Sequence, residues 1–164
     1  MSKMNKVIQE IVNHYYLNFE LGMQYLSFSN EVAKVGYYNF SKYLRDLADD
    51  KLTTHKDILF DYIKRTDNCL SIGEYKFNIQ HIHDVKKIVD FVFNEEMKIR
   101  EKVKEMSCLS LDEKDHESFH LLTWFVNDGI KDFQKIKKIH KLFELSNSVI
   151  EIDQAITEII EDKE

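Results

Sequence analysis

Apolar residues recur along this chain every three or four positions, which is the spacing that one buried face of an α-helix requires. The pattern predicts four long helices and a short fifth one, over residues 4–34, 39–66, 83–107, 111–144 and 148–161. Ser-x-x-Glu sequences at 110–113 and 148–151 predict capping boxes at the starts of the last two helices. Gly36 predicts the end of the first helix, and Asn39 is a candidate cap for the second.

The lengths of the links predict how these helices are connected. The link between the first and second helices has about four residues, so the two should be antiparallel neighbours. Residues 66–82 form a longer, partly extended link that can carry the chain along the whole bundle, so the second and third helices should run parallel. A short link then joins the third helix to the fourth. The sequence therefore predicts an all-α protein with one domain over 1–164, a four-helix bundle with a single long crossover.

Composition supports this class and limits the partners. The 164 residues include no proline and only four glycines, which is unfavourable for β-sandwiches and barrels. The formal charge is −6 and lysines are scattered among acids, so nucleic acid is not an expected partner. We find no apolar run of the kind needed for a signal peptide or a membrane span, and we expect a cytoplasmic protein away from the membrane. Cys69 and Cys108 lack metal-ligand spacing, and we expect them to be free thiols.

Ionisable residues interrupt the apolar stripe of each long helix near its middle. They are Glu20, His55 and Glu96 in the first three helices, and Asp128 with Asp132 in the fourth. Burying an unpaired acid costs several kcal/mol, so a cation bound between the helices would explain all of them. Mixed carboxylate and imidazole ligands favour iron, manganese or zinc over calcium. In the first helix, this interpretation assumes an inward line of Val12, Tyr16, Glu20 and Met23.

Each of these residues also has an ordinary explanation when it is taken singly. A lone inward histidine is usually a core residue with a satisfied hydrogen bond. A lone glutamate often lies at the edge of a helix and reaches solvent. The metal interpretation depends on finding such residues at similar height on all four helices.

Four stretches around these residues resemble a known family. They are Asn-Phe-Glu-Leu at 18–21, His55 followed by Leu-Phe-Asp-Tyr at 59–62, Phe-Asn-Glu-Glu at 93–96, and Phe-His-Leu-Leu-Thr-Trp-Phe-Val at 119–126. In this order and spacing they are similar to bacterial non-haem ferritins, and Ile152-Asp153 is similar to that family's short last helix. The resemblance covers nearly the whole chain.

The resemblance implies an iron-storage protein that assembles as a homo-oligomeric shell of 24 subunits around a ferric oxide mineral. Ferrous iron would be oxidised by dioxygen or peroxide at a two-metal ferroxidase site inside each bundle. Carried over to this sequence, Glu20 and His55 would hold one iron, and Glu96 the second with help from Asp132 and, tentatively, Asp128. The iron is non-haem, and neither haem nor a nucleotide is expected.

Several positions depart from the family pattern. The family has Glu-x-x-His on its second helix, whereas Leu52 stands three residues before His55 here. The Gln-x-x-Glu of the fourth helix is replaced by a sequence that begins with Gly129 and ends with Asp132. A tyrosine that the family places seven residues after its first ligand corresponds to Ser27.

Two lysines, Lys51 and Lys131, match positions of carboxylates around the family's extra iron site. Lys51 could take the electrostatic place of a metal ion, or both lysines could be solvated on the helix surface. A shift of the second helix by one residue would offer Asp50 or Lys51 as a bridging residue, but it would move His55 out of phase.

These departures predict an altered centre. Two ferrous ions held close together need a bridging anion, and the bridging glutamate is missing. We therefore expect one well-bound iron at Glu20 and His55, a weakly bound second one, and slow oxidation. The alternatives are a ferritin-like shell that does not oxidise iron, and a helical interaction protein that has lost the metal.

Acidic residues also gather where the fourth helix is predicted to begin. Asp112, Asp115 and Glu117 are among them. Negative charge at a helix N-terminus is stabilising, and this is sufficient reason for most of them. The resemblance adds a second interpretation, in which they line a pore that admits iron.

Overall fold

The protein is described by a computed structural model over residues 5–68 and 76–162. These residues form seven helical segments: α1 (Lys6–Lys34), α2 (Tyr38–Asp50), a π-helical turn η1 (Lys51–His55), α3 (Lys56–Arg65), α4 (Val85–Asp112), α5 (His116–Leu145) and α6 (Val149–Glu161). Residues 76–84 have neither helix nor strand. Cys69 and the part of the predicted link at 69–75 lie outside the described residues.

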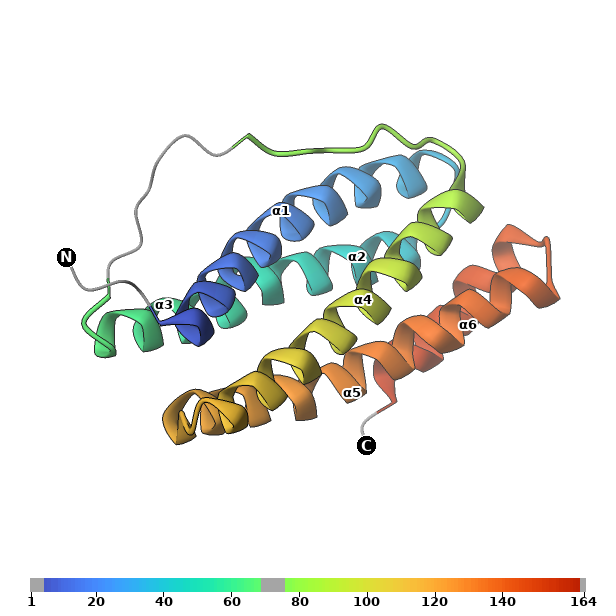
Figure 1. Cartoon of the computed structure of the whole chain (residues 1–164). Coiled ribbons are helices and arrows are strands. Elements are labelled where there is room, and N and C mark those ends of the chain that lie inside the picture. The colour runs from blue at the N-terminus through green and yellow to red at the C-terminus, as the bar shows by residue number, and fades with distance from the viewer. Residues whose placement is uncertain (1–4, 69–75, 163–164) are drawn as a thin grey trace.

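The helices form a bundle with one crossover (Figure 1). α1 runs antiparallel to the continuous rod formed by α2, η1 and α3, and residues 76–84 run along α1 to the start of α4. α4 therefore runs parallel to α2 and α3, and α5 runs back beside α4. α6 folds back against α2 and α5. The predicted all-α, ferritin-like arrangement with one crossover and a short last helix is confirmed.

Some predicted helix ends are confirmed and two predicted caps are wrong. Gly36 follows the end of α1 with a φ of 95°, a left-handed conformation that glycine adopts without strain. The Ser148 hydroxyl accepts a hydrogen bond from the backbone N–H of Glu151 at the start of α6. Asn39 does not cap the second helix. The Asp153 carboxylate of α6 instead accepts hydrogen bonds at 3.0 Å from the first backbone N–H groups of α2, including that of Phe40.

The predicted capping box at Ser110 is also wrong. α4 continues through this residue, and the buried Ser110 hydroxyl donates a hydrogen bond back to the Ser107 carbonyl within the helix. The chain turns at Lys114, whose φ of 57° is left-handed, and α5 begins at His116. The helix-start signal therefore belongs to Asp115, whose carboxylate accepts from the backbone N–H of Ser118.

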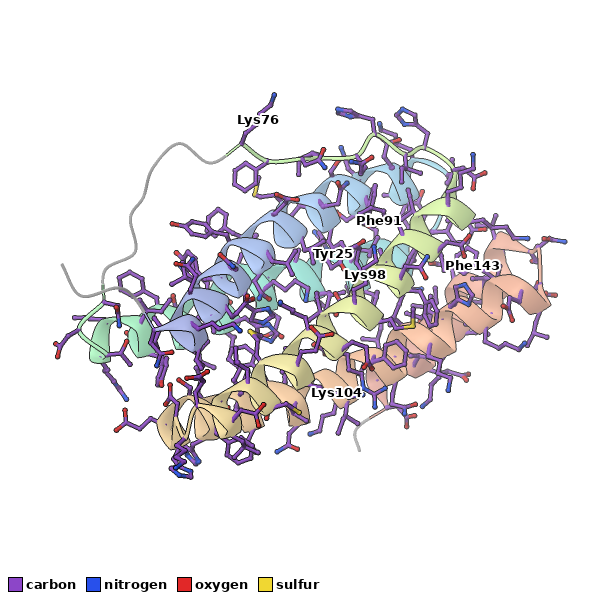
Figure 2. All side chains as sticks on the ribbon, in the orientation of Figure 1. Tyr25, Lys76, Phe91, Lys98, Lys104 and Phe143 are labelled. Carbon is purple, nitrogen blue, oxygen red and sulfur yellow. The ribbon has the colours of Figure 1, made fainter. Side chains whose placement is uncertain are left out.

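The core has two apolar clusters with polar residues between them. One cluster contains Phe28, Leu44, Val92 and Ile136, and the other contains Ile11, Leu59, Val103 and Leu122. Five buried polar residues lie in sequence between their helices' members of the two clusters: His14, Asn18, Lys51, His55 and Glu96. Figure 2 shows Lys76 pointing away from the bundle, in contrast to the buried Tyr25. None of the helices in the described ranges is both long and apolar enough to cross a membrane.

Candidate metal centre

The π-helical turn η1 determines which side chains of the rod formed by α2, η1 and α3 face the interior. A π-turn takes in one residue more than an α-turn, and such turns occur frequently at functional sites. Lys51 and His55 begin and end this turn, and both side chains are buried. The assumption that a residue at 50–51 and His55 could not face the interior together is therefore wrong. It presupposed a regular α-helix.

Leu52 faces α1 instead of the bundle interior. It lies over Gly22, where a Cβ atom would come within 2.5 Å of Leu52 Cγ. Glycine is needed at this position because the two helices approach so closely. Leu52 replaces no ligand in the interior, since Lys51 holds the inward position in its place.

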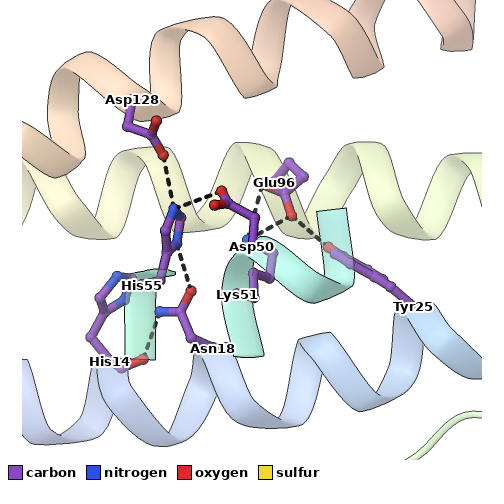
Figure 3. Close-up of polar contacts among 8 residues, drawn as sticks. All are labelled: His14, Asn18, Tyr25, Asp50, Lys51, His55, Glu96 and Asp128. Carbon is purple, nitrogen blue, oxygen red and sulfur yellow. Dashed lines mark hydrogen bonds and ion pairs between the residues drawn. The ribbon is translucent and has the colours of Figure 1, made fainter. Parts of the chain in front are cut away.

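Four ionisable side chains converge between α5 and the rod formed by α2, η1 and α3. They are Asp50, His55, Asp128 and Asp132, and one ligand atom from each lies within 4.8 Å of the others. We call this set the acidic group. The His55 imidazole lies at its centre, with Nε2 2.8 Å from Asp128 Oδ2 and 3.1 Å from Asp50 Oδ2 (Figure 3).

Electrostatic interactions within the acidic group alter two pKa values. Burial opposes a charge on His55, but hydrogen bonds to Asp128 and Asp50 outweigh burial and raise its pKa to about 9. Burial, together with the neighbouring acids, raises the pKa of Asp132 to about 7 against the lowering effect of Lys51. The oxygens that stabilise a positive imidazolium would also stabilise a metal cation, which would compete with that proton.

A second polar set lies beside the first. The Lys51 ammonium is 3.1 Å from Glu96 Oε1, and the Tyr25 hydroxyl donates a hydrogen bond of 2.7 Å to the same oxygen (Figure 3). We call these three residues the lysine group. All three are buried, and the Lys51 side chain is only 1% exposed. Glu96 thus faces the interior as predicted, but its carboxylate is paired with an ammonium and lies outside the acidic group.

The predicted inward line of the first helix is right at Val12, which is buried, and wrong at Glu20 and Met23. Met23 is 42% exposed, whereas Asn18 and Tyr25 are fully buried. The Asn18 side chain lies 3.1 Å from His55 Nδ1 through its oxygen and donates through its nitrogen to a backbone carbonyl. Tyr25 is seven residues after Asn18, so the tyrosine sought at Ser27 is present two residues earlier. A neutral amide therefore occupies the inward position that the resemblance assigned to a glutamate.

Glu20 lies elsewhere on α1. It lines a pocket of about 260 Å³ together with Asn78 and Gln80 of the crossover. Gln24 holds the crossover there, since its amide donates to the Gln80 carbonyl and accepts from the Gln80 N–H. The structure does not bring Glu20 to His55, and the expected pairing of the two as ligands has no support in this geometry.

The structure does bring together His55, Asp128 and Asp132, and it adds Asp50. Asp50 was considered in the sequence only as an alternative bridging residue. An acid five residues before an inward histidine was the signal, but only a π-turn gives it this meaning. Gly129 faces open space, with no neighbouring atom within 4 Å of a Cβ placed there. Lys131 is exposed.

Asp115 and Glu117 have the structural role that capping predicts at the start of α5, whereas Asp112 does not. Asp115 is the cap itself, and Glu117 lies in the first turn. Glu117 also lines a pocket of about 790 Å³ with His116 and His120. Asp112 is the last residue of α4. A pore at this corner stays a prediction.

His14 is a buried residue that the sequence analysis did not single out. Its ring packs edge-on against Phe125, and neither ring nitrogen has a hydrogen-bond partner among the described residues. Burial lowers the pKa of His14 to about 3, and the positive charges of Lys51, His55 and Lys102 add to this effect. The imidazole is therefore neutral at physiological pH.

A crossover bundle with carboxylates and an imidazole in its middle is the architecture of the ferritin-like proteins, and comparison with known proteins agrees. The family model for the ferritin-like domain matches residues 6–146, so the chain belongs to the ferritin-like family.

Individual relatives extend this result. An uncharacterised protein of Ureaplasma urealyticum is 34% identical over 168 residues, which cover 100% of this chain and 96% of the relative. A bacterial non-haem ferritin of Escherichia coli is 24% identical over 126 residues, 75% of each chain. The crystal structure of M. penetrans ferritin superposes with a TM-score of 0.85 at 24% identity, covering 94% of this chain and 96% of that one.

Proposed function

We propose that the protein is the subunit of a ferritin-type, homo-oligomeric shell that stores iron in the cytoplasm, and that the acidic group binds one ferrous ion per subunit. The observation that carries this proposal is the convergence of Asp50, His55, Asp128 and Asp132 within 4.8 Å. Membership of the ferritin-like family supports iron as the cargo. A shell of 24 subunits, as in the resemblance, belongs to the same proposal.

The donor set suits a single ferrous ion. Three carboxylates and one imidazole are oxygen and nitrogen ligands of the kind that iron accepts. The carboxylates also supply more negative charge than one divalent cation carries, so a metal ion would relieve their mutual repulsion. Asn18 faces His55 Nδ1 and holds the ring so that Nε2 faces the acids.

Oxidation at such a site should be slow. A single ferrous ion has one electron to give, whereas reduction of dioxygen to hydrogen peroxide takes two electrons and two protons. The remaining inward carboxylate, Glu96, is already paired with Lys51. We therefore propose a weak ferroxidase that passes ferric iron to the mineral, with dioxygen or peroxide as the oxidant.

The test is an anaerobic titration with ferrous iron, followed by aerobic oxidation. We expect one tightly bound iron per subunit, and Asp128→Asn should weaken it at least about tenfold because a ligand is lost. Glu20→Gln is the matched control, since it removes a carboxylate that the structure places outside the acidic group. Equal losses in the two variants, or no binding by the wild type, would overturn the proposal.

A shell that accepts mineral without oxidising iron is the second candidate. The ion pair between Lys51 and Glu96 favours it, because this pair removes a carboxylate from metal binding. The two candidates differ in aerobic kinetics. If the wild type and Asp128→Asn consume oxygen at the same rate with ferrous iron, the subunit is a non-oxidising one. If Asp128→Asn is slower, the acidic group is the oxidation site.

A further inference from the structure

We propose that the Lys51 ammonium is a built-in cation that holds the place of a second metal ion and limits each subunit to one. The inference rests on the proposed function, since it concerns the same interior layer of the bundle. It assigns a role to a residue that neither the fold nor the family membership explains.

The Glu96 carboxylate is fully paired within the protein. It faces the bundle interior, where an unpaired negative charge is strongly unfavourable. Lys51 Nζ lies 3.1 Å from Oε1 and 3.5 Å from Oε2, so the ammonium faces both oxygens. Tyr25 donates a further hydrogen bond to Oε1. The carboxylate is thus satisfied by one positive charge and one hydroxyl, without a metal ion.

Lys51 lies at the boundary between the acidic group and the lysine group. It follows Asp50 directly in the chain, at the start of the π-turn, and the two side chains diverge from there (Figure 3). Asp50 reaches His55 in the acidic group, while Lys51 reaches Glu96. Asp132 interacts electrostatically with both Lys51 and Glu96, so the two groups are close enough to share one field. A metal ion at Glu96 would have to displace the ammonium from the carboxylate.

The consequence is a limit on the electrons that one subunit can supply. Two ferrous ions at neighbouring sites lose two electrons together, which reduce one dioxygen to hydrogen peroxide with two protons from water. One ferrous ion loses one electron, and a second equivalent must come from another subunit or another iron. Lys51 therefore sets the number of metal ions, and through it the chemistry.

The decisive variant is Lys51→Glu, examined as the full chain with cobalt(II) alone as the probe. The substitution replaces the ammonium with a carboxylate opposite Glu96, and so offers a second cation two acids. We expect one cobalt(II) per subunit in the wild type and two in Lys51→Glu, counted by anaerobic calorimetry and by visible absorption. Aerobic iron oxidation by Lys51→Glu should be at least tenfold faster and should yield one hydrogen peroxide per two irons.

The control is the double variant Lys51→Met/Glu96→Gln, which removes both charges of the ion pair. It should bind one cobalt(II) per subunit, as the wild type does. Two in this variant would mean that the second ion binds without the Glu96 carboxylate, and would overturn the second site assigned to it. A single cobalt(II) in folded Lys51→Glu would overturn the proposal as well.

Lys51→Glu places two acids together in the interior and can fail to fold without metal. Lys51→Met then provides the test, since it leaves Glu96 unpaired without adding a charge. Saturating cobalt(II) should raise the melting temperature of Lys51→Met more than that of the wild type, and an equal rise would contradict the proposal. Absence of cobalt(II) binding by the wild type would count against the proposed function only. The gain on substitution tests Lys51 separately.

Discussion

The acidic group and the lysine group are neighbours in the bundle and differ in net charge. Asp50 and Lys51, adjacent in sequence, each belong to one of them. The acidic group collects three carboxylates around one imidazole, so negative charge remains after every internal contact is made. The lysine group contains one ammonium, one carboxylate and one hydroxyl, and its charges cancel. The first set can accept a cation, and the second already contains one.

This difference explains why a family resemblance by itself does not settle the metal content of a bundle. The number of inward acids is less informative than the number that remain unpaired. Glu96 is inward and acidic, yet its charge is neutralised within the protein. Asp132 is inward and acidic, and its pKa is raised to about 7, chiefly by burial and then by the neighbouring carboxylates.

The largest effect should come from breaking the pair in the lysine group. Glu96→Gln leaves a buried ammonium without its counter-charge, and we expect the free energy of unfolding to fall by about 3–5 kcal/mol. In metal-free buffer, Asp132→Asn should instead raise it by about 0.5–2 kcal/mol, because it removes one of three repelling charges. Urea unfolding of both variants measures the contrast. Shifts of the same sign would show that the two groups do not differ as described.

The second prediction concerns how two buried histidines, His55 and His14, affect the pH dependence of stability. His55 has two acidic partners and a pKa of about 9, whereas burial and nearby cations lower the pKa of His14 to about 3. A neutral buried His14 must stay unprotonated in the folded state, while an unfolded histidine binds a proton below its pKa of about 6.5. Stability is therefore lost through His14 as the pH falls from 6.5 towards 3, by about 1.4 kcal/mol per pH unit.

His14→Leu tests this loss by removing the titrating group. The free energy of unfolding, measured in urea at pH 7 and at pH 5, should fall less in the variant by about 2 kcal/mol. The charged groups that act on the ring, Lys51, His55 and Lys102, remain in both proteins. An unchanged pH dependence would mean that His14 is hydrated or paired in solution.

The third prediction concerns the contact that fixes the π-turn beside α1. Gly22→Ala places a Cβ against Leu52 Cγ, and we expect a loss of about 1–3 kcal/mol from overpacking. Gly129→Ala is the matched control, because a Cβ there meets open space and should add about 1 kcal/mol through helix propensity. The double variant Gly22→Ala/Leu52→Ala should lose less free energy of unfolding than the two single variants lose together. Thermal unfolding of five proteins decides this: the wild type, the double variant and the single variants at Gly22, Leu52 and Gly129.

Much of the fold could be predicted because it depends on repeated local signals. Apolar spacing identified the long helices, and the length of the crossover gave the parallel arrangement. The errors at Asn39 and Ser110 arose where the local signal was not decisive. Asp153 caps α2 from the far end of the chain, and no local pattern announces a cap that tertiary packing supplies.

The site could be predicted only in part, because a π-turn changes which side chains of the second helix face the interior. His55, Asp128 and Asp132 came out of regular helical spacing, and the structure brings them together. Asp50 and the inward Lys51 depend on a π-turn, which shifts every later side chain and leaves no clear mark in sequence. On α1, the line through Tyr16 and Glu20 looked as regular as the true line through Asn18 and Tyr25. Partners on other helices decided between them.

The smallest effect should come from the other lysine that the sequence placed near the metal. Lys131 is exposed on α5, so its charge is screened by water, whereas Lys51 is enclosed. Lys131→Glu should change the free energy of unfolding by less than about 0.5 kcal/mol. It should also leave the number of cobalt(II) ions at one per subunit. A second ion in Lys131→Glu, or a loss as large as that of Glu96→Gln, would mean that exposed and enclosed lysines act alike here. Enclosure and direct pairing with Glu96 would then not be what distinguishes Lys51 from Lys131.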